Sequence, residues 1–398
     1  MKLILKIKYI KGLINMLIQT TKKLRDELNL EELEQKERPD LFSWHANFLR
    51  INRRKTVVLV NDACDYTVLL YGMKKDDLNN FPGRVKEGIR RTFEREGIKE
   101  SLIEKYLSQF EEFFYKKAEN RSYIARMNNS CKFAKRFADR FNENEIYQSQ
   151  IAKNVNNMHR KNDNKDYFYP DDFLQQKLAE YFGEEDVIKT KAAVLKVELD
   201  LGEYEAWRKF IVPLSYNFRE LHKIIQQLYN WQDYHLHEFF VYSEEKDDTK
   251  NWNQSEYHRN GYKAILNLAM NQENFEYNRD QLNFAAEDFE QAVENEVKLK
   301  DVLPARIKYI YDYGDFWHHY LETEEIIDDY KSNKPTFLEG GGTAPPEDVG
   351  GVSGFSEFMQ IISNPDDEEY QLMMEWAESQ RFEEYDPEEL KSAIERYF

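Results

Sequence analysis

The order of strand-like and helix-like segments in the second half of the chain constrains the fold more than any other feature of the sequence. Apolar residues alternate with other residues in five short segments, as they do in half-buried strands. These segments are residues 193–201, 206–212, 235–242, 306–311 and 317–324. One helix-like segment, residues 218–229, separates the second strand from the third. This order predicts an α+β fold in which the helix packs on an antiparallel or mixed sheet.

The predicted helix has one apolar face. Leu221, Ile224 and Leu228 recur at the spacing that brings side chains to the same side of a helix. Ser215 precedes the segment and belongs to the residue types that cap helices. We therefore expect the three apolar side chains to be buried against the sheet.

The first half of the chain predicts a β-hairpin followed by helices. Thr56–Val60 and Tyr66–Tyr71 are strand-like, and the Asn-Asp pair between them favours a turn. Apolar residues then follow helical spacing through residues 78–95, 101–117 and 122–141. This part is therefore predicted to be a second α+β unit, made of a hairpin plus helices.

A chain of 398 residues is long for one compact domain and comfortable for two. Its charge changes sign along the chain, because residues 1–140 carry 30 Lys+Arg and 20 Asp+Glu, whereas residues 141–398 carry 26 and 54. A polar segment that contains Pro170 lies near this change. The predicted organisation is a leader or upstream-start extension over 1–15, an N-terminal α+β domain over 16–159, a linker with a short helix over 160–185 and a second domain over 186–398.

Several classes of protein are excluded by what the sequence lacks. With only Cys64 and Cys131, the chain has no disulfide framework and no multi-cysteine metal cluster. Free cysteines fit a reducing compartment, so a cytoplasmic location is predicted. Lysines interrupt the apolar N-terminal segment, which therefore predicts neither a signal peptide nor a membrane span. The sequence also has no Gly-Lys-Ser/Thr phosphate loop and no His-Glu-x-x-His motif.

The basic end of the third predicted helix is the candidate nucleic-acid surface. Lys132, Arg136 and Arg140 lie there beside three phenylalanines at helical spacing, Phe133, Phe137 and Phe141. They could form one stripe with the basic residues of an earlier helix, which are Arg84, Lys86, Arg90, Arg91 and Arg95. The alternative, which we favour, is an aromatic seam that faces the core and has a solvated charged flank.

Several strings in the second half resemble one protein family. They are Trp207-Arg208-Lys209 with Val212-Pro213, LHKIIQQLYNW at 221–231, HLHEF at 235–239, YDYGDFWHH at 311–319 and PPEDVGG at 345–351. Together with the acidic tail, they resemble the plasmid pRiA4b ORF-3-like family over about residues 190–395. The resemblance implies an α+β roll. It also implies an association with plasmids or other mobile elements, since members are labelled TnpR, an insertion-element passenger.

The resemblance implies no established activity. No serine-recombinase pattern supports the resolvase chemistry that the TnpR label suggests. Residues around 40–140 resemble an uncharacterised domain that is often fused ahead of this family. Ala344 stands where the family commonly has cysteine, so any thiol chemistry at that position is absent from this chain.

Four residues of these motifs form the candidate site. His235 and His237 are two apart on a predicted strand, so their rings share one face, and Asp315 and His319 share a face on a later strand. If the two faces meet, three imidazoles and a carboxylate could bind Zn, Mn or Fe, or act as general acid and base. The alternative, which we favour, is a structural hydrogen-bond network. The cofactor is unknown, and a divalent metal is not favoured.

The glycine- and proline-rich segment Glu339–Gly354 is predicted to be an ordered loop that closes over the sheet. It contains no Lys or Arg, and Glu347 and Asp348 are acidic, which argues against phosphate binding. A functional alternative is that Glu347 and Asp348 add carboxylates to the histidine face.

Three classes of function follow from the sequence, and it does not decide whether the chain is an enzyme. The first is an interaction or binding module of a plasmid- or mobile-element-associated protein, with an unknown partner. The second is a nucleic-acid-binding protein that uses the basic first half. The third is a metal-dependent enzyme that uses the face of His235, His237, Asp315 and His319.

Overall fold

The structure is a computed structural model that describes residues 15–30, 38–110, 112–161, 166–246, 258–271, 273–274 and 289–398. The chain divides into two compact units, Met1–Lys189 and Thr190–Phe398. The extension predicted over residues 1–15 lies outside the described residues except for Asn15.

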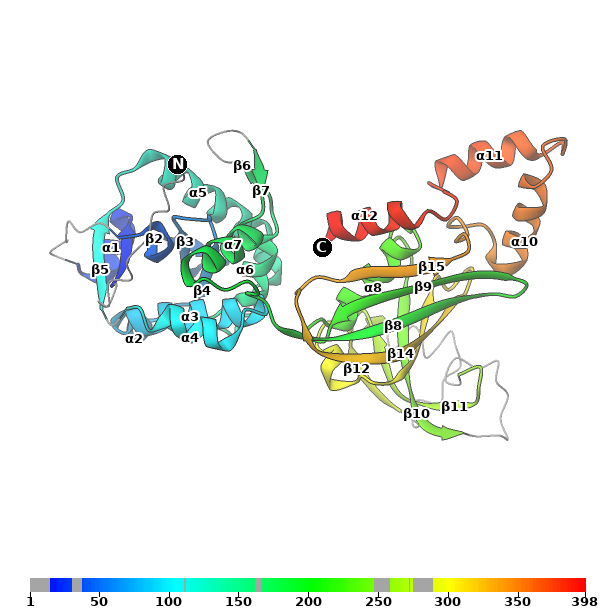
Figure 1. The fold of residues 1–398 in the computed structure, drawn as a ribbon, viewed down its shortest axis with the longest axis horizontal. Helices are drawn as coiled ribbons and strands as arrows, with labels where there is room; N and C mark the ends of the chain where they lie inside the picture. The colour runs from blue at the N-terminus through cyan, green and yellow to red at the C-terminus, as the bar shows by residue number, and fades with distance from the viewer. Residues whose placement is uncertain are drawn as a thin grey trace, which may run out of the picture. The chain divides into compact units, whose positions relative to one another are not determined.

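The first unit is built on a five-stranded mixed sheet in the order β4-β3-β2-β1-β5 (Figure 1). The strands are β1 (Met16–Thr20), β2 (Ser43–Ile51), β3 (Arg54–Asn61), β4 (Thr67–Tyr71) and β5 (Phe113–Lys117). Strands β2, β3 and β4 pair antiparallel, and β1 pairs parallel with both β2 and β5. A short separate pair joins β6 (Arg160–Lys161) to β7 (Tyr167–Phe168). The predicted hairpin is confirmed as β3 and β4.

Helices cover both faces of this sheet because alternate residues of its strands are apolar. Val57 and Leu59 face the core that contains α3 (Phe81–Arg95), whereas Val58 and Val60 face the core that contains α5 (Arg121–Arg136). The remaining helices are α1 (Lys22–Leu28), α2 (Lys75–Asn79), α4 (Glu100–Leu107), α6 (Ser149–Asn156) and α7 (Pro170–Phe182). Since α3 and α5 lie on opposite faces, their basic residues do not form the single stripe that the sequence suggested.

Two segments of the first unit differ from the sequence prediction. The helix predicted over 101–117 ends at Leu107, and Phe113–Lys117 is instead the strand β5 at the edge of the sheet. Its parallel pairing with β1 is a long-range contact that local spacing cannot indicate. Residues 160–185, expected as a linker with a short helix, contain α7, whose Leu174 and Leu178 are buried in the core of the first unit. The division between the units falls after Lys189.

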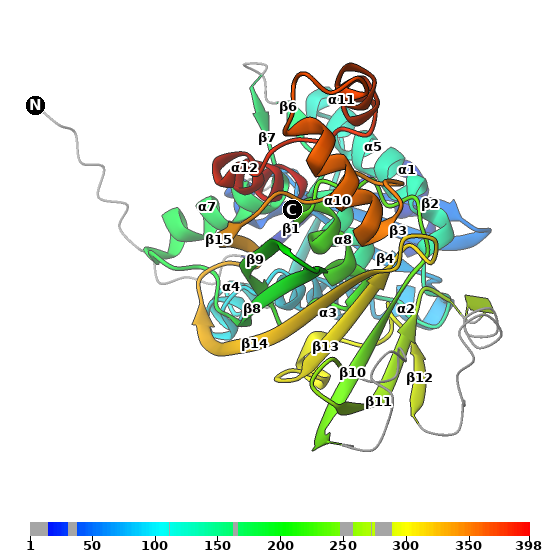
Figure 2. The same ribbon diagram turned by 90° about the vertical axis from the view of Figure 1, so that its right-hand side faces the viewer.

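The second unit is built on an eight-stranded sheet in the order β12-β11-β10-β13-β14-β8-β9-β15 (Figures 1 and 2). The strands are β8 (Thr190–Leu201), β9 (Tyr204–Pro213), β10 (His237–Lys246), β11 (Tyr262–Ala269), β12 (Glu290–Val293), β13 (Arg306–Tyr311), β14 (Trp317–Tyr330) and β15 (Thr336–Gly341). All neighbours pair antiparallel except β11 and β12. The five predicted strands are adjacent in this one sheet, which confirms the predicted α+β class.

Helix α8 (Phe218–Leu228) packs on one face of this sheet. Leu221, Ile224 and Leu228 are fully buried, as predicted. The helix is capped by Asn217 rather than Ser215, because the Asn217 side chain accepts from the Glu220 amide while the Glu220 carboxylate accepts from the Asn217 amide. The last helices are α10 (Gly351–Ile362), α11 (Tyr370–Ser379) and α12 (Pro387–Tyr397), and α12 contacts both α8 and β15.

Within the described ranges, no helix combines the length and the apolar character needed to cross a membrane.

Candidate functional site

The structure places the four predicted site residues in four different surroundings. His237 and His319 both face α8, but β13 lies between their strands, and two strand spacings amount to about 9.5 Å. The ring of Tyr309 fills the gap, with its centroid 5.8 Å from His237 and 5.1 Å from His319. His235 precedes β10, and Asp315 lies in the turn before β14. A single ion therefore cannot be held by all four residues.

His237 belongs instead to a network that we call the histidine pair, formed by His222, His237, Asp233 and Glu294. Both rings and Glu294 are buried, and Asp233 is exposed. The rings of His222 and His237 stack with centroids 3.6 Å apart and planes 5° apart. His222 Nε2 lies 2.7 Å from Asp233 Oδ1, and His237 Nε2 lies 2.8 Å from Glu294 Oε2. Each imidazole is thus bonded to its own carboxylate.

Neighbouring side chains complete this network. Arg219 contacts the second oxygen of each carboxylate, since Nη2 lies 3.3 Å from Asp233 Oδ2 and Nη1 lies 3.3 Å from Glu294 Oε1. The Tyr309 hydroxyl lies 2.7 Å from His222 Nδ1 and accepts a hydrogen bond of 3.1 Å from Gln226. These contacts fix the orientation of His222 and of both carboxylates.

Burial and hydrogen bonding set the protonation state of the histidine pair. Burial, followed by the nearby His237, lowers the pKa of His222 to about 3. Burial alone would raise the pKa of Asp233 and Glu294, but the hydrogen bonds from the imidazoles and the charge of Arg219 lower both below their usual values. Near neutral pH, His222 is therefore neutral and donates to an ionised carboxylate.

The spacing of the histidine pair identifies it as a hydrogen-bond network. Two ligand atoms at 2.0 to 2.2 Å from one tetrahedral ion lie about 3.3 to 3.6 Å apart. The observed nitrogen-to-oxygen distances of 2.7 and 2.8 Å are shorter than that and are typical of charge-assisted hydrogen bonds. The sequence analysis favoured a structural network for the face of His235, His237, Asp315 and His319, and of these residues only His237 belongs to the network seen here.

A second group, which we call the loop trio, consists of His235, Asp312 and Asp348. One ligand atom from each residue lies within 4.8 Å of the others. His235 Nδ1 is 3.7 Å from Asp312 Oδ1, and His235 Nε2 is 3.3 Å from Asp348 Oδ1. The His235 side chain is 25% exposed and that of Asp348 is 56% exposed. The histidine of the trio is therefore partly exposed, whereas both rings of the histidine pair are buried.

The other predicted carboxylates hold loops in place. Glu347 is buried and accepts from the Tyr311 hydroxyl at 2.5 Å and from the Gln232 amide at 2.9 Å. The Asp315 carboxylate accepts from the Gly350 amide at 3.1 Å. Of the two predicted loop carboxylates, Asp348 thus contacts a predicted histidine, whereas Glu347 fastens its loop to a tyrosine of β13.

The remaining predicted histidine, His319, is enclosed by aromatic rings. Its Nδ1 donates to the Trp317 carbonyl at 3.2 Å, and the rings of Tyr229 and Trp231 lie 4.9 and 5.2 Å away. Burial lowers its pKa to about 3, so it is neutral near neutral pH. His319 is therefore part of the apolar core rather than an accessible acid or base.

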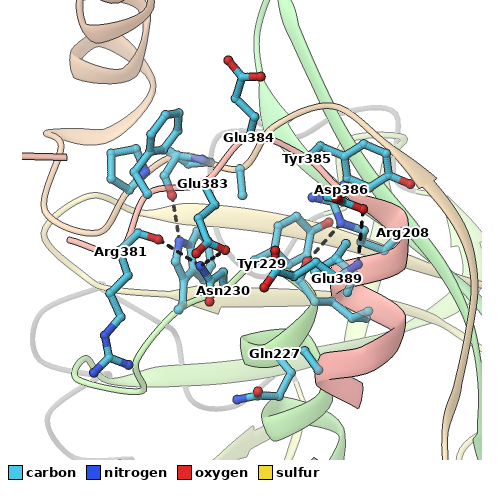
Figure 3. Close-up of a pocket in the computed structure, with 18 of the residues that line it drawn as sticks. Arg208, Gln227, Tyr229, Asn230, Arg381, Glu383, Glu384, Tyr385, Asp386 and Glu389 are labelled. Carbon is cyan, nitrogen blue, oxygen red and sulfur yellow. Dashed lines mark hydrogen bonds between the residues drawn. The ribbon is translucent and has the colours of Figure 1, made fainter. Parts of the chain in front are cut away.

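A pocket of about 170 Å³ lies beside the glycine run that ends β15 (Figure 3). Arg208 is buried there between the rings of Tyr229 and Tyr385, with its guanidinium carbon 5.1 and 4.6 Å from their centroids. Its Nη1 donates to the carbonyls of Gly341 and Gly342. A Cβ at Gly342 would lie 1.6 Å from a backbone oxygen, so only glycine fits. The glycine run presents carbonyl acceptors here, which agrees with the prediction that it is no phosphate cradle.

The predicted nucleic-acid residues lie at the C-terminal end of α5 and just beyond it. Lys132 and Arg136 are exposed on the last turns of α5, and Arg140 is exposed in the following 3₁₀ turn, Ala138–Arg140. The rings of Phe133 and Phe137 are partly buried against the core beneath the helix. The aromatic residues thus face inward, as in the alternative that the sequence analysis favoured.

Sequence reasoning missed the members of the histidine pair other than His237. A signal was present for His222 and Gln226, which are polar, four residues apart and next to the apolar stripe of α8. No sequence pattern indicates Asp233 or Glu294, because both lie in connecting segments where side chains do not follow helix or strand spacing. Asp312 was part of a quoted motif, but its contact with His235 depends on how two loops meet.

These observations define a two-unit α+β protein whose second unit holds a central helix, a buried histidine pair and an accessible loop trio. The chain matches the plasmid pRiA4b ORF-3-like protein family over residues 191–393, about half of its length, and it belongs to this family. The first unit matches a domain of unknown function, DUF6933, over residues 17–173. Both resemblances noted in the sequence are thereby confirmed.

Two known proteins are similar to about half of this chain. The uncharacterized protein y4hQ of Sinorhizobium fredii is 26% identical over 189 residues, which cover 48% of this chain and 82% of that protein. The crystal structure of MM3350, a protein of unknown function from Methanosarcina mazei Go1, is 27% identical, with a TM-score of 0.38, and the match covers 50% of this chain and 97% of that one. Neither description states an activity, so function must be argued from the residues of this chain.

Proposed function

We propose that this chain is a binding protein whose first unit binds nucleic acid through what we call the basic surface, formed by Arg53, Lys132, Lys135, Arg136 and Arg140. Lys132, Lys135 and Arg136 share one side of α5 because they are three and four residues apart. The turn that carries Arg53 is tied to the end of this helix by a hydrogen bond of 2.6 Å from Asn52 to the Ala138 carbonyl. This bond places Arg53 beside the turn that carries Arg140, at the C-terminal end of α5.

The observation that carries this proposal is that four of these five cations lack a carboxylate partner among the described residues. Among the residues with described positions, Arg53, Lys132, Lys135 and Arg136 make no ion pair, and Arg140 is only 3.9 Å from its neighbour Asp139. Like charges three and four residues apart on a helix repel one another and cost some stability. An anionic partner would relieve this repulsion.

The basic residues of α3 serve as an internal comparison. Arg90 contacts Glu100 and Glu104, Arg91 contacts Glu87 at 2.6 Å, and Arg84 contacts Asp77 at 2.7 Å. These arginines are already neutralised by carboxylates of the same unit. The two helices are similarly basic in sequence, yet only α5 keeps its cations available for an external anion.

In the proposed complex, the basic surface contacts the phosphate backbone rather than the bases. Phe133 and Phe137 are partly buried, and Arg136 and Arg140 lie over their rings, with guanidinium carbons 5.1 and 5.7 Å from the centroids. These rings offer little free face for stacking on bases. Cations that contact phosphates position a nucleic acid without specifying its sequence. We therefore expect sequence-independent, strongly salt-dependent binding.

The experiment measures binding of the full chain to a short fluorescent DNA duplex of mixed sequence by anisotropy, starting at about 50 mM salt, where phosphate contacts are strongest. The double variant Lys132→Gln/Arg136→Gln should weaken binding by at least about tenfold and reduce the salt slope by about 1.8, which corresponds to two lost phosphate contacts. The matched control Arg90→Gln/Arg91→Gln removes the same charge from α3 and should bind like the wild type.

Two outcomes would contradict the proposal. One is an absence of binding by the wild type at low salt. The other is an equal loss in both double variants, because this would make net charge rather than the basic surface responsible. The chain as a whole has a net charge of -18, so retention of DNA cannot come from its overall charge.

Two further parts of the functional assignment are also proposals. The family's description supports an association with plasmids, and we extend it to mobile elements in general. A cytoplasmic location is supported by the two cysteines, which are buried and unpaired.

A further inference from the structure

We propose that the loop trio of His235, Asp312 and Asp348 binds a divalent transition-metal ion. The three residues come from different segments of the chain, one before β10, one after β13 and one in the loop before α10. One ligand atom of each lies within 4.8 Å of the others. The inference concerns the second unit and does not depend on nucleic-acid binding by the first.

The contact between His235 Nε2 and Asp348 has the spacing of two ligands around one ion rather than that of a hydrogen bond, whereas Asp312 faces the other nitrogen of the ring. His235 Nε2 and Asp348 Oδ1 are 3.3 Å apart, and His235 Nδ1 and Asp312 Oδ1 are 3.7 Å apart. Two ligands of one tetrahedral ion lie about 3.3 to 3.6 Å apart. His235 Nε2 is an enclosed atom and has no hydrogen-bond partner in the described part of the chain. The trio therefore leaves an imidazole lone pair available.

The chemistry of the donors selects the class of ion. One imidazole and two carboxylates suit zinc, manganese and related divalent ions, whereas calcium and magnesium prefer sites made of oxygen alone. Three protein ligands leave at least one coordination position for water or an external ligand. Since the imidazole must be deprotonated to bind, we expect the metal affinity to fall in acid.

The loops that carry the trio are held in place independently of the ion. Asp312 Oδ1 accepts from the Gly314 amide at 2.8 Å, and the carboxylate of Asp315 accepts from the Gly350 amide. Trp231 donates to the Pro345 carbonyl at 2.9 Å. These bonds pin the Asp312 and Asp348 loops, so binding would require small movements of side chains rather than folding of a loop.

The test uses the full chain, purified without a histidine tag, freed of metal with a chelator and titrated with Co²⁺ and with Zn²⁺. We expect one equivalent of Co²⁺ to give a visible absorption band of low-symmetry coordination, and Zn²⁺ to displace it. His235→Ala and Asp348→Asn should each weaken Zn²⁺ binding by at least about tenfold. The matched control is His159→Ala, which removes an exposed histidine of the first unit and should leave the titration unchanged.

The same titrations can overturn the proposal in three ways. The first is an absence of a saturating equivalent for the wild type. The second is an equal loss of affinity in His159→Ala, which would indicate nonspecific binding by surface histidines. The third is binding that survives His235→Ala but disappears in His222→Gln, which would place the ion in the histidine pair. Circular dichroism of each variant distinguishes loss of ligand from loss of folding.

Discussion

The histidine pair and the loop trio use the same side-chain types in the same unit, and they differ in the distances between these groups and in the burial of their histidine rings. In the pair, nitrogen and oxygen lie 2.7 to 2.8 Å apart. In the trio, the corresponding distances are 3.3 to 3.7 Å, and two of the three side chains reach solvent. The pair also has an arginine that bridges both carboxylates. Within the pair, every carboxylate oxygen therefore has a partner.

This difference shows that a count of histidines and carboxylates does not define a site. Short contacts between an imidazole N–H and an ionised carboxylate occupy the ring nitrogen and the carboxylate oxygen that face each other. The longer contacts of the trio leave its imidazole and carboxylates without such short bonds to one another. We infer that the pair stabilises the fold, whereas the trio contributes little to stability and is free to act on a ligand. The predictions below test this contrast.

The largest effect is expected for Glu294→Ala in the histidine pair. The substitution leaves the His237 N–H without its acceptor and removes one of the two carboxylates that hold Arg219. Removal of one partner from a buried charged pair costs about 3 to 5 kcal/mol. Urea unfolding followed by tryptophan fluorescence should show this loss. The exposed Glu290 on the neighbouring strand is the control, and Glu290→Ala should change stability by less than about 0.5 kcal/mol.

A smaller effect is expected from acid acting on His222. Its pKa in the folded chain is about 3, against about 6.5 for an unperturbed histidine, so the stability that it contributes is complete above pH 6.5 and is lost as the pH falls below this value. The loss amounts to about 1.4 kcal/mol per pH unit, or about 2 kcal/mol at pH 5. The reason is that the unfolded chain gains a proton that the folded chain cannot accept.

The measurement compares the pH dependence of unfolding in the wild type and in His222→Gln. The comparison is needed because burial raises the pKa of Glu96 to about 7 and that of Asp65 to about 6 in the first unit, which acts in the opposite direction. Between pH 6.5 and pH 5, the free energy of unfolding should fall by less in the variant than in the wild type. The difference should be about 2 kcal/mol, the effect of the one proton that His222 binds only in the unfolded wild type. Parallel curves for the two proteins would mean that His222 is not held neutral.

Much of the second unit could be predicted because its sequence pattern follows its burial. The alternation along β8, β9 and β13 corresponds to side chains that alternate between the α8 face and the opposite face. The short strands β11 and β12 were not predicted, because a segment of four to eight residues has too little pattern to indicate a strand by itself. Pairing with neighbouring strands determines their structure. In the same way, β5 carries Phe and Tyr at positions that suit a helix as well as a strand.

The candidate site was less predictable than the fold for a related physical reason. The sequence placed His237 and His319 on one face of the sheet, and the structure places them there, but β13 separates the two strands. Strand order across a sheet is not encoded by local spacing. His235 was expected on the same face as His237, yet β10 begins only at His237, so His235 belongs to the preceding loop and meets Asp348 instead.

The smallest effect on stability is expected for Asp348→Asn in the loop trio. This variant tests whether the trio contributes little to the stability of the fold. The side chain is 56% exposed, its contact with His235 is longer than a good hydrogen bond, and an amide keeps the size of the carboxylate. Surface ion pairs contribute about 0 to 1 kcal/mol, so the free energy of unfolding should change by less than about 0.5 kcal/mol in urea. A loss comparable to that of Glu294→Ala would make the trio a structural network like the pair. A negligible loss, in a protein whose other loop carboxylate, Glu347, is buried and fully bonded, would mean that Asp348 is held at the surface for something other than the stability of the fold.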